Sequence, residues 1–329
     1  MKSFLIIQTA FIGDVILATP VAEKLRLFFP SARIDFLVRK GNENLLANNP
    51  FVDNIIIWNK KTNKYKNLFK SIGLIRKTKY DYVINIQRFL ATGLITALSG
   101  AKYKTGFSNN PFSFLYTKKI KHLIKTGVHE TQRNLSLIEY LTDKSFIKPQ
   151  LYPSKEDNSL ISVYKKNKYI CIAPASVWFT KQYPQNKWIE LIDLLKEKYT
   201  IYLLGGKEDV LFCETIAKRF CTYNTKNLAG SLSLLQTSSL MKDAVMNFVN
   251  DSAPLHIASA VNAPVTAIFC STVPAFGFGP LSDISFVAET LEKLKCRPCG
   301  LHGYKKCPEK HFNCAFSIKT ETLINNLPV

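Results

Sequence analysis

The sequence predicts an α/β fold of two domains, each a parallel sheet flanked by helices. A chain of 329 residues is longer than one hydrophobic core normally supports, so two domains are expected. Short apolar runs alternate with longer amphipathic segments, which is typical of βαβ units. A polar segment at 144–166 carries Pro149 and Pro153 and separates two such series. We therefore expect domains at 1–160 and 161–329.

The first series predicts four strands joined by helices. Apolar, β-branched runs predict strands at 4–8, 33–38, 54–58 and 82–86. Helical periodicity predicts helices near 15–28, 41–48, 67–78 and 89–99. The apolar N-terminal stretch resembles a signal peptide, but Gln8 and Asp14 interrupt it, so we interpret it as the first strand and helix.

The second series repeats the pattern. Strands are predicted at 169–173, 200–204, 244–249 and 265–269. Helices are predicted near 185–197, 208–220 and 253–261. Open parallel sheets bind ligands at the carboxyl ends of their strands, so two such domains predict a cleft where those ends face each other. Residues that directly follow strands are therefore the candidate site residues.

The charge of the chain indicates an anionic partner. Lys and Arg number 44 against 24 Asp and Glu, a formal charge of +20. Residues 1–160 carry +14 of it, and the stretches 60–79 and 102–125 contain many lysines. A solvated surface and a surface for phosphates of nucleic acid or an anionic membrane remain open alternatives. No apolar run reaches the 18 residues of a membrane span, so the protein is not expected to be integral.

The eight cysteines divide into two groups. Four are scattered in apolar segments, where buried free thiols of a cytosolic protein are expected: Cys171, Cys213, Cys221 and Cys270. The other four form a C-x2-C-x7-C-x6-C pattern: Cys296, Cys299, Cys307 and Cys314. Structural zinc, disulfide or redox pairing, and reduced thiols all fit this spacing, and none of them makes the segment catalytic.

The turn after the first strand lacks the G-x-G-x-x-G pattern, which disfavours a dinucleotide redox cofactor. Asp14 stands at the predicted helix start, where the helix dipole favours an ionised carboxylate that could accept a proton from a substrate hydroxyl. Helix capping by Asp14 is the alternative.

Polar groups also follow the strands of the second series. Ser176, Thr180 and Lys181 follow residues 169–173 and could bind phosphate oxygens. Gly206 allows close approach of a ligand to the backbone, and Glu208 could bind ribose hydroxyls or begin a helix.

The segment 249–258 carries the most specific local signal. Asp251 or Ser252 can cap a helix that has Pro254 in its first turn, and the free N–H groups there form an anion site for a diphosphate. His256 lies one turn further, where a structural role is the alternative to a functional one.

Five segments together resemble glycosyltransferase family 9, the ADP-heptose:lipopolysaccharide heptosyltransferases. They occur in order over nearly the whole chain: FLIIQTAFIGDVILATP, APASVWFTKQYPQNKW, LLGGKED, NLAGSLSLLQ and NDSAPLHIASAVNAPVTAIF. The segment CRPCGLHGYKKCPEKHFNC resembles the Cys-rich tail of the heptosyltransferase II branch.

The resemblance implies a GT-B fold with an N-terminal acceptor domain, a C-terminal nucleotide-sugar domain and a final helix that packs back on the first domain. It implies inverting transfer of L-glycero-D-manno-heptose from ADP-heptose to the lipopolysaccharide inner core, on Kdo- or heptosyl-Kdo-lipid A, with no metal or cofactor required for catalysis. Asp14 would be the general base, and Lys181 would stabilise the leaving diphosphate. The implied substrate-binding residues are Gly13, Ser176, Thr180, Gly206, Glu208, Asp251, Ser252, Ala253 and His256.

Three positions depart from the family pattern. Ala175 and Ala253 replace glycines, and Gln182 replaces a basic residue. These changes leave open another nucleotide sugar or glycan acceptor, and charge alone leaves open a non-catalytic protein that binds anionic lipid or nucleic acid. The expected partners are ADP-heptose, the lipopolysaccharide precursor and an anionic membrane surface, not nucleic acid. The expected location is cytoplasmic, peripheral at the inner face of the inner membrane.

Overall fold

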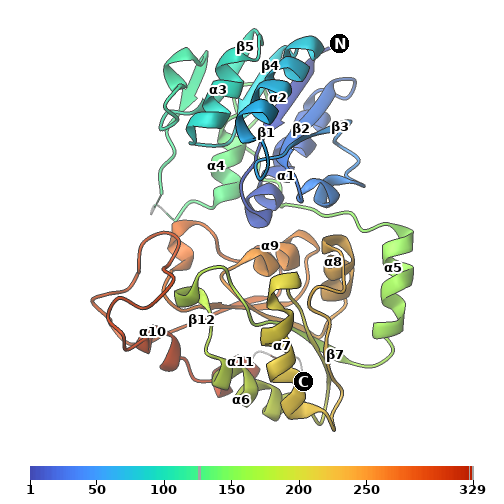
Figure 1. Cartoon of the computed structure of the whole chain (residues 1–329), viewed down its shortest axis with the longest axis vertical. Helices are drawn as coiled ribbons and strands as arrows, with labels where there is room; N and C mark the ends of the chain where they lie inside the picture. Colours follow the sequence, from blue (N-terminus) through green and yellow to red (C-terminus); the bar gives the residue numbers. More distant parts are fainter. Residues whose placement is uncertain (125–126, 326, 328–329) are drawn as a thin grey trace. The chain divides into compact units, whose positions relative to one another are not determined.

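The computed structural model describes residues 1–124, 127–325 and 327, and divides into two compact units, Met1–Tyr152 and Pro153–Val329 (Figure 1). The division falls inside the expected linker 144–166, but at 152/153 instead of 160/161. The reason is that helix α5 (Lys155–Ile161) packs against α8 (Leu234–Lys242) of the second unit. Lys125, the last residue of the basic stretch 102–125, lies outside the described residues.

The first unit is built on a parallel sheet with the order β3-β2-β1-β4-β5-β6. Its strands, within the described residues, are β1 (Ser3–Ile7), β2 (Arg33–Arg39), β3 (Asn54–Trp58), β4 (Tyr82–Asn85), β5 (Tyr103–Phe107) and β6 (Lys118–Ile120). The four predicted strands are present. The sequences of β5 and β6, YKTGF and KKI, are short and polar, so hydrophobic periodicity did not identify them.

Helices cover both faces of this sheet. They are α1 (Ile12–Phe28), α2 (Lys64–Thr78), α3 (Leu90–Leu98) and α4 (Glu130–Ser136). The inner sides of α2 and α3, with Ile72 and Ile95, share one apolar core with Leu5, Leu37 and Val83 of the sheet. On the other side α1 packs against α4. The helix predicted at 41–48 is only a 3₁₀ turn, η1 (Glu43–Leu46), and the asparagines around it favour such turns because they compete for backbone hydrogen bonds.

Helix α1 tolerates a proline in its interior because a neighbouring side chain replaces the missing donor. Pro20 has no N–H for the Ile16 carbonyl, and the Thr19 hydroxyl donates to that carbonyl at 2.8 Å. The Asn134 amide of α4 donates to the Leu17 carbonyl at 3.1 Å. These contacts keep the long buried helix, and the residues at its start, in a fixed position.

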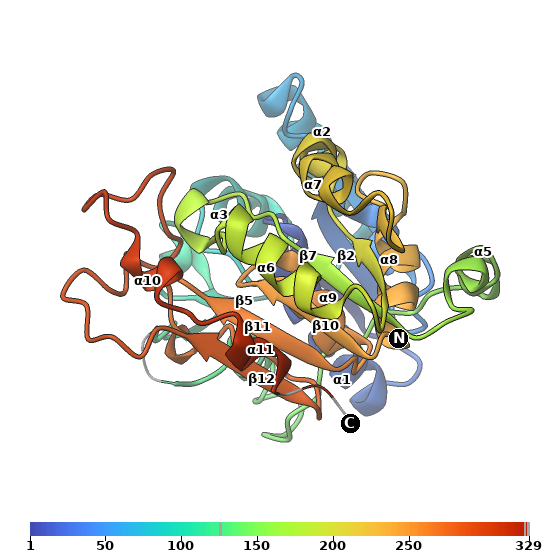
Figure 2. The ribbon, with the colours of Figure 1, turned by 90° about the horizontal axis from the view of Figure 1, so that it is seen from below.

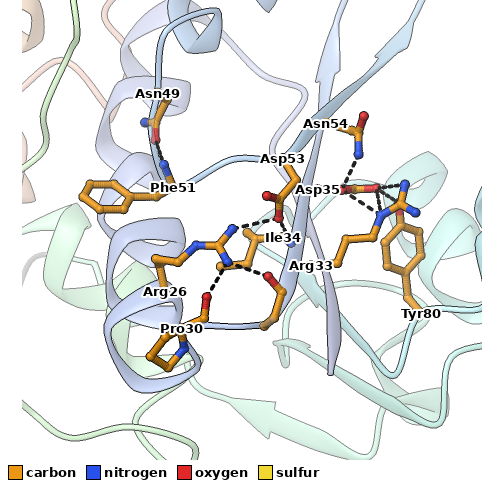
Figure 3. Close-up of polar contacts among 11 residues, drawn as sticks. Arg26, Pro30, Arg33, Ile34, Asp35, Asn49, Phe51, Asp53, Asn54 and Tyr80 are labelled. Carbon is orange, nitrogen blue, oxygen red and sulfur yellow. Dashed lines mark hydrogen bonds and ion pairs between the residues drawn. The ribbon is translucent and has the colours of Figure 1, made fainter. Parts of the chain in front are cut away.

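The buried carboxylate of Asp35 fixes the positions of the strands β2 and β3 beside α1 (Figure 3). Asp35 is fully buried in β2 and accepts hydrogen bonds from the Arg33 guanidinium at 2.9 Å, from the Asn54 amide at 3.3 Å and from the Tyr80 hydroxyl. Asp53 in turn accepts from the Ile34 N–H at 2.6 Å. A buried carboxylate is stable only with such partners, so these contacts fix β2 and β3.

The second unit repeats the topology with the order β12-β11-β10-β7-β8-β9, and Figure 2 shows β7, β10, β11 and β12 side by side. The strands are β7 (Tyr169–Ala173), β8 (Thr200–Leu203), β9 (Thr225–Asn227), β10 (Met246–Asn250), β11 (Val265–Phe269) and β12 (Ser285–Glu289). Both sheets thus have the strand order typical of doubly wound folds. The structure confirms the predicted fold class, and adds β9 and β12, which the sequence did not predict.

Helices and the chain end complete the second unit. Besides α5 and α8 they are α6 (Gln185–Leu195), α7 (Val210–Ala217), α9 (Ala253–Ala260), α10 (Asn313–Phe316) and α11 (Glu321–Ile324). One apolar core joins α6, α7 and the sheet with Cys314 and Leu323 of the last two helices. Within this unit α11 packs against α6.

The length and composition of a helix decide whether it could cross a membrane. Among the described residues, none of the helices combines the length and the apolar character needed to cross a bilayer.

Candidate active site

The turn after β1 places Asp14 at the switch point of the first sheet, where neighbouring strands lie on both sides of β1. A buried network fixes the turn: the Thr9 hydroxyl donates to Gln87 at 2.8 Å, and the Gln87 amide donates to Gln8 at 2.6 Å. Asp14 accepts the Phe11 N–H at 3.1 Å, so the contact expected of a helix cap is present. Gly13 is buried directly beside it.

The environment of Asp14 disfavours its ionised form. Burial and the negative charge of Glu130 raise the pKa of Asp14 to about 6, while the Phe11 N–H and the charge of Arg39 act in the opposite direction. The helix start favours the ionised carboxylate, but burial outweighs it and raises the pKa above the usual range of an aspartate. A carboxylate with a pKa near 6 is a stronger base than an ordinary aspartate and is still ionised at neutral pH.

Glu130 is a residue that the sequence reasoning missed. Burial opposes its ionisation, but hydrogen bonding and charge from His122 and the charge of Arg133 outweigh burial and lower its pKa. The Arg133 Nε donates to Glu130 at 2.6 Å, and the His122 Nε2 lies 3.1 Å from the same carboxylate. Glu130 therefore stays charged close to Asp14. Its Glu-x-x-Arg spacing, after 48 residues without an acidic side chain, was the available signal.

Two cations lie at the same edge of the first sheet. Arg39 ends β2; burial lowers its pKa, and the charge of Asp14 counteracts this. The Lys60 ammonium donates to the Thr9 carbonyl at 2.7 Å, and burial, with the charges of Arg39 and Lys64, lowers its pKa to about 8. The sequence placed Lys60 in an exposed basic stretch. The structure corrects this, because Lys60 contacts the turn that carries Asp14.

Lys181 lies at the corresponding switch point of the second sheet. The loop after β7 forms a 3₁₀ turn, η4 (Phe179–Lys181), whose last residue directs its ammonium to Asp251 at the end of β10. The Lys181 Nζ is 2.7 Å from the Asp251 Oδ2, and the Thr272 hydroxyl donates to the same oxygen at 2.6 Å. The two charged side chains are 14% and 7% exposed, so the pair is largely shielded from solvent. The structure thus brings two predicted site residues into contact.

Asn250 connects the two loops that carry this pair. Its side chain is fully buried; it donates to the Pro174 carbonyl at 2.9 Å and accepts the Tyr183 N–H at 2.9 Å. Both ends of the loop after β7 are therefore attached to the end of β10. The sequence reasoning assigned Asn250 no role, although a polar residue ending an apolar strand was a usable signal.

Ser176 and Thr180 differ in exposure. Ser176 is partly exposed, and its carbonyl accepts a hydrogen bond from the Gln182 amide at 2.6 Å. The Gln182 side chain therefore stabilises the loop. Thr180 is 1% exposed, and its hydroxyl oxygen accepts the Tyr304 N–H at 2.7 Å. The structure therefore gives Thr180 an internal contact that the sequence did not predict.

The remaining predicted residues also follow strands of the second sheet. Glu208 is exposed beside Gly206, whose N–H donates to Asp209 at 2.8 Å, so Asp209 rather than Glu208 holds this helix start. The Ser252 hydroxyl donates to the Asn250 carbonyl at 3.4 Å, and Ala253 begins α9.

His256 is buried one turn into α9. Its ring centroid lies 6.3 Å from that of Phe278, an edge-on aromatic contact. The buried position and the ring contact agree with the structural alternative weighed for a helical histidine.

The cysteines are free thiols. Cys171, Cys213 and Cys270 are buried as predicted, whereas Cys221 is exposed. In the Cys-rich segment, the Cys299 thiol donates to the Cys296 carbonyl at 3.1 Å, and burial raises the pKa of Cys299. In the part of the chain that the structure describes, no group of three or more His, Cys, Asp or Glu is arranged to hold a metal ion.

The predicted site residues thus form two sets. Asp14 and Gly13 lie in the first unit with Arg39, Lys60 and Glu130, and the others lie in the second unit, where Lys181 pairs with Asp251. Each set lies at the carboxyl ends of parallel strands, where open α/β sheets bind ligands.

Comparisons with known proteins agree with this arrangement. The model of Glycosyltransferase family 9 (heptosyltransferase) matches residues 68–304. Lipopolysaccharide heptosyltransferase 3 of Escherichia coli K12 is 29% identical over 302 residues, which are 87% of this chain and 88% of that protein.

Solved structures share the fold. A family 9 glycosyltransferase from Veillonella parvula superposes with a TM-score of 0.87 at 22% identity, covering 99% of this chain and 96% of that one. The ADP-heptose lps heptosyltransferase II of E. coli superposes with a TM-score of 0.81 at 20% identity, covering 99% and 97%. This likeness confirms the predicted GT-B fold. With the family model matching well over half of the sequence, the chain belongs to glycosyltransferase family 9 and is a glycosyltransferase.

Proposed function

We propose that this enzyme transfers L-glycero-D-manno-heptose from ADP-heptose to the inner core of lipopolysaccharide, with inversion at the anomeric carbon. The observation that carries the proposal is the shielded Lys181 ammonium, held by Asp251 at the switch point of the second sheet. A fixed cation at that edge is suited to a nucleotide diphosphate. Similarity to a lipopolysaccharide heptosyltransferase and to an ADP-heptose heptosyltransferase supports this choice of donor and acceptor.

In the proposed reaction Asp14 acts as the general base. It takes the proton of the acceptor hydroxyl while that oxygen attacks the anomeric carbon and the bond to the diphosphate breaks. The raised pKa of Asp14 suits this role because a base with a pKa near the working pH transfers protons efficiently. Burial raises that pKa most, and the charge of Glu130, which His122 and Arg133 keep ionised, adds to the effect.

Lys181 acts on the leaving group. Negative charge builds up on the diphosphate as the bond breaks, and a pre-positioned ammonium stabilises it. Ser176, Gly206, Glu208, Ser252 and Ala253 would contact the nucleotide around it. Proton transfer and charge stabilisation are both provided by side chains, so the proposed reaction requires no cofactor.

The acceptor is proposed to reach the first unit from an anionic membrane surface, at the cytoplasmic face of the inner membrane. Helix α2 supports this, because it exposes aromatic and basic side chains together. Tyr65 and Phe69 are 71% and 59% exposed, and Lys64, Lys66 and Lys70 beside them are exposed as well. Basic residues that flank apolar ones are typical of helices that lie on anionic bilayers.

The transfer proposal is tested with ADP-heptose and defined acceptors, Kdo-lipid A with and without a first heptose, followed by mass spectrometry. Addition of one heptose to either acceptor is expected, with NMR of the product showing inverted anomeric configuration. Turnover of UDP- or GDP-sugars, with ADP-heptose unused, would contradict the proposal.

The membrane proposal is tested separately by changing Lys64, Lys66 and Lys70 to Gln and measuring sedimentation with phosphatidylglycerol vesicles. Binding and its salt dependence are expected to fall. Changing Lys187, Lys196 and Lys218 of the second unit to Gln is the matched control. Equal binding of both triple variants and the wild type would contradict the α2 assignment.

A further inference from the structure

The Cys-rich segment that follows β12 contacts the loop after β7, which carries Lys181 and is called the lysine loop below. The backbone of Tyr304 makes these contacts. The Thr180 N–H donates to the Tyr304 carbonyl at 3.1 Å, and the Tyr304 N–H donates to the Thr180 hydroxyl oxygen at 2.7 Å. The Ser271 hydroxyl donates to the same Thr180 oxygen at 3.1 Å. The Tyr304 residue itself is 46% exposed, so burial of its ring does not account for the contact. The residue directly before Lys181 is thus held by the Cys-rich segment.

Gly303 lies against the lysine side chain. Its backbone has a φ of +74°, and a Cβ added there would lie 2.8 Å from the Thr180 hydroxyl oxygen and 3.0 Å from the Lys181 Cγ. Carbon atoms in proteins rarely approach so closely, so any other residue would displace the loop. The absence of a side chain at position 303 lets the segment contact the stem of Lys181 directly.

Arg297 holds the other side of the ion pair. Its guanidinium donates to the carbonyls of Cys270 and Thr272 at 2.8 Å and of Phe269 at 3.0 Å, and it forms an ion pair with Glu289 at 2.7 Å. The Phe269 carbonyl ends β11, and the other two carbonyls lie in the segment after it, up to Thr272, whose hydroxyl donates to Asp251. The planar fork of an arginine can bind several fixed carbonyls at once, which a lysine cannot do.

We propose that residues 297–304 form a strap that positions the Lys181–Asp251 pair for the nucleotide diphosphate, with Arg297 and Gly303 as its positioning residues. The proposal rests on the proposed function for the identity of the ligand. Through Tyr304 and Gly303 the strap sets the position of Lys181, and through Arg297 it sets that of Thr272 and hence of Asp251. The Cys-rich segment thereby contributes to donor binding without contacting the donor.

The chain offers a matched pair of variants, Gly303→Ala and Gly300→Ala. Both glycines have a left-handed backbone, with φ of +74° and +67°, so alanine introduces comparable backbone strain at each. A Cβ at position 300 would meet only Tyr304, with its hydroxyl at 3.4 Å, whereas a Cβ at position 303 would meet Lys181 and Thr180. The two variants therefore separate general strain from displacement of the lysine loop.

The test measures ADP affinity by calorimetry, KM for ADP-heptose, kcat and melting temperature for both variants. We expect Gly303→Ala to weaken ADP binding by about tenfold and to raise KM more than it lowers kcat, because a charge-assisted contact is lost. Gly300→Ala is expected to melt like Gly303→Ala but to bind ADP like the wild type. Equal ADP affinity in the two variants would overturn the proposal.

Hydrogen–deuterium exchange without nucleotide separates this proposal from the proposed function. Faster exchange is expected around Thr180 in Gly303→Ala and around Thr272 in Arg297→Met. Arg297→Lys is expected to restore the exchange around Thr272 in part, and Gly300→Ala to leave both regions unchanged. If the wild type fails to bind ADP, the proposed function fails, but the exchange result still decides whether the strap holds the loop. Unchanged exchange in Gly303→Ala would overturn the strap.

Discussion

The two units share one strand order but carry opposite charges at corresponding positions. In the first unit the turn after the central strand β1 presents the carboxyl of Asp14, with a pKa raised to about 6. In the second unit the loop after the central strand β7 presents the ammonium of Lys181, held by Asp251. The comparison teaches that the scaffold sets where a functional group lies, and that the local sequence sets its charge.

The units also differ in what supports those groups. Around Asp14 burial makes the carboxyl a better base, and the neighbours Glu130 and Arg39 act through charge. Around Lys181 the neighbours Thr180 and Thr272 act through short hydrogen bonds, and the strap 297–304 fixes the loop from outside the βαβ units. The first site is therefore expected to respond to pH, and the second to geometry.

The largest effect is expected from Asp14→Asn. The amide retains the size of the side chain and can accept the Phe11 N–H, but it cannot take a proton. Turnover is expected to fall by roughly 10²–10⁴-fold. The measurement is kcat with ADP-heptose, with circular dichroism as the check of folding. Turnover at the wild-type rate in a folded variant would remove Asp14 as the base.

Lys181→Met is expected to lower kcat/KM by roughly 10²–10³-fold, since the charge on the leaving diphosphate is left without its ammonium partner. The matched control is Lys187→Met, which removes a lysine that pairs with Glu190 on α6, away from the Asp251 pair. Steady-state kinetics of both variants checks this. Similar losses in the two would show that Lys181 has no special role.

The pH profile should report the environment of Asp14. Because the base must be deprotonated, kcat/KM is expected to decline tenfold per unit as pH falls below about 6 and to level off above it. In Glu130→Gln the raising effect of that charge is gone, so the inflection should move to lower pH. A profile that bends near pH 4 in the wild type would show that burial does not control this carboxyl.

The smallest effect concerns stability. The pKa of Asp14 is higher in the folded chain than its unfolded value of 3.8, so its contribution to stability is lost as pH rises through about 6. Asp14→Asn should therefore stabilise the fold at pH 8 by roughly 1 kcal/mol, less than the full shift implies because the side chain is partly exposed. Urea unfolding at pH 5 and pH 8 measures this. A variant less stable than the wild type at pH 8 would contradict the burial argument.

Hydrophobic periodicity was sufficient to predict the fold class and the central strands, because β1, β4, β7 and β10 are buried on both faces and read as apolar runs. Edge strands such as β6, with the sequence KKI, carry no such signal. They form because the neighbouring strand offers a free edge, which is a property of the assembled sheet and not of their own residues.

The site was predictable in part for a related reason. Residues that follow apolar strands, Asp14, Lys181 and Asp251, could be identified because a parallel sheet collects them at one edge. Glu130 and Arg297 follow no predicted strand, and their roles arise from contacts with His122 and with the carbonyls at and just after the end of β11, so position alone did not identify them. The residues found by position carry the proposed chemistry, and the residues found only in the structure support them.

The central claim is that the first unit supplies the base, Asp14, and that the second unit binds the donor through Lys181. Calorimetric titration of ADP-heptose into Asp14→Asn and Lys181→Met tests this claim most directly. We predict that Asp14→Asn binds ADP-heptose as tightly as the wild type, although it transfers the sugar far more slowly, whereas Lys181→Met loses at least tenfold in affinity. Loss of donor affinity in Asp14→Asn equal to that in Lys181→Met would contradict the division of roles.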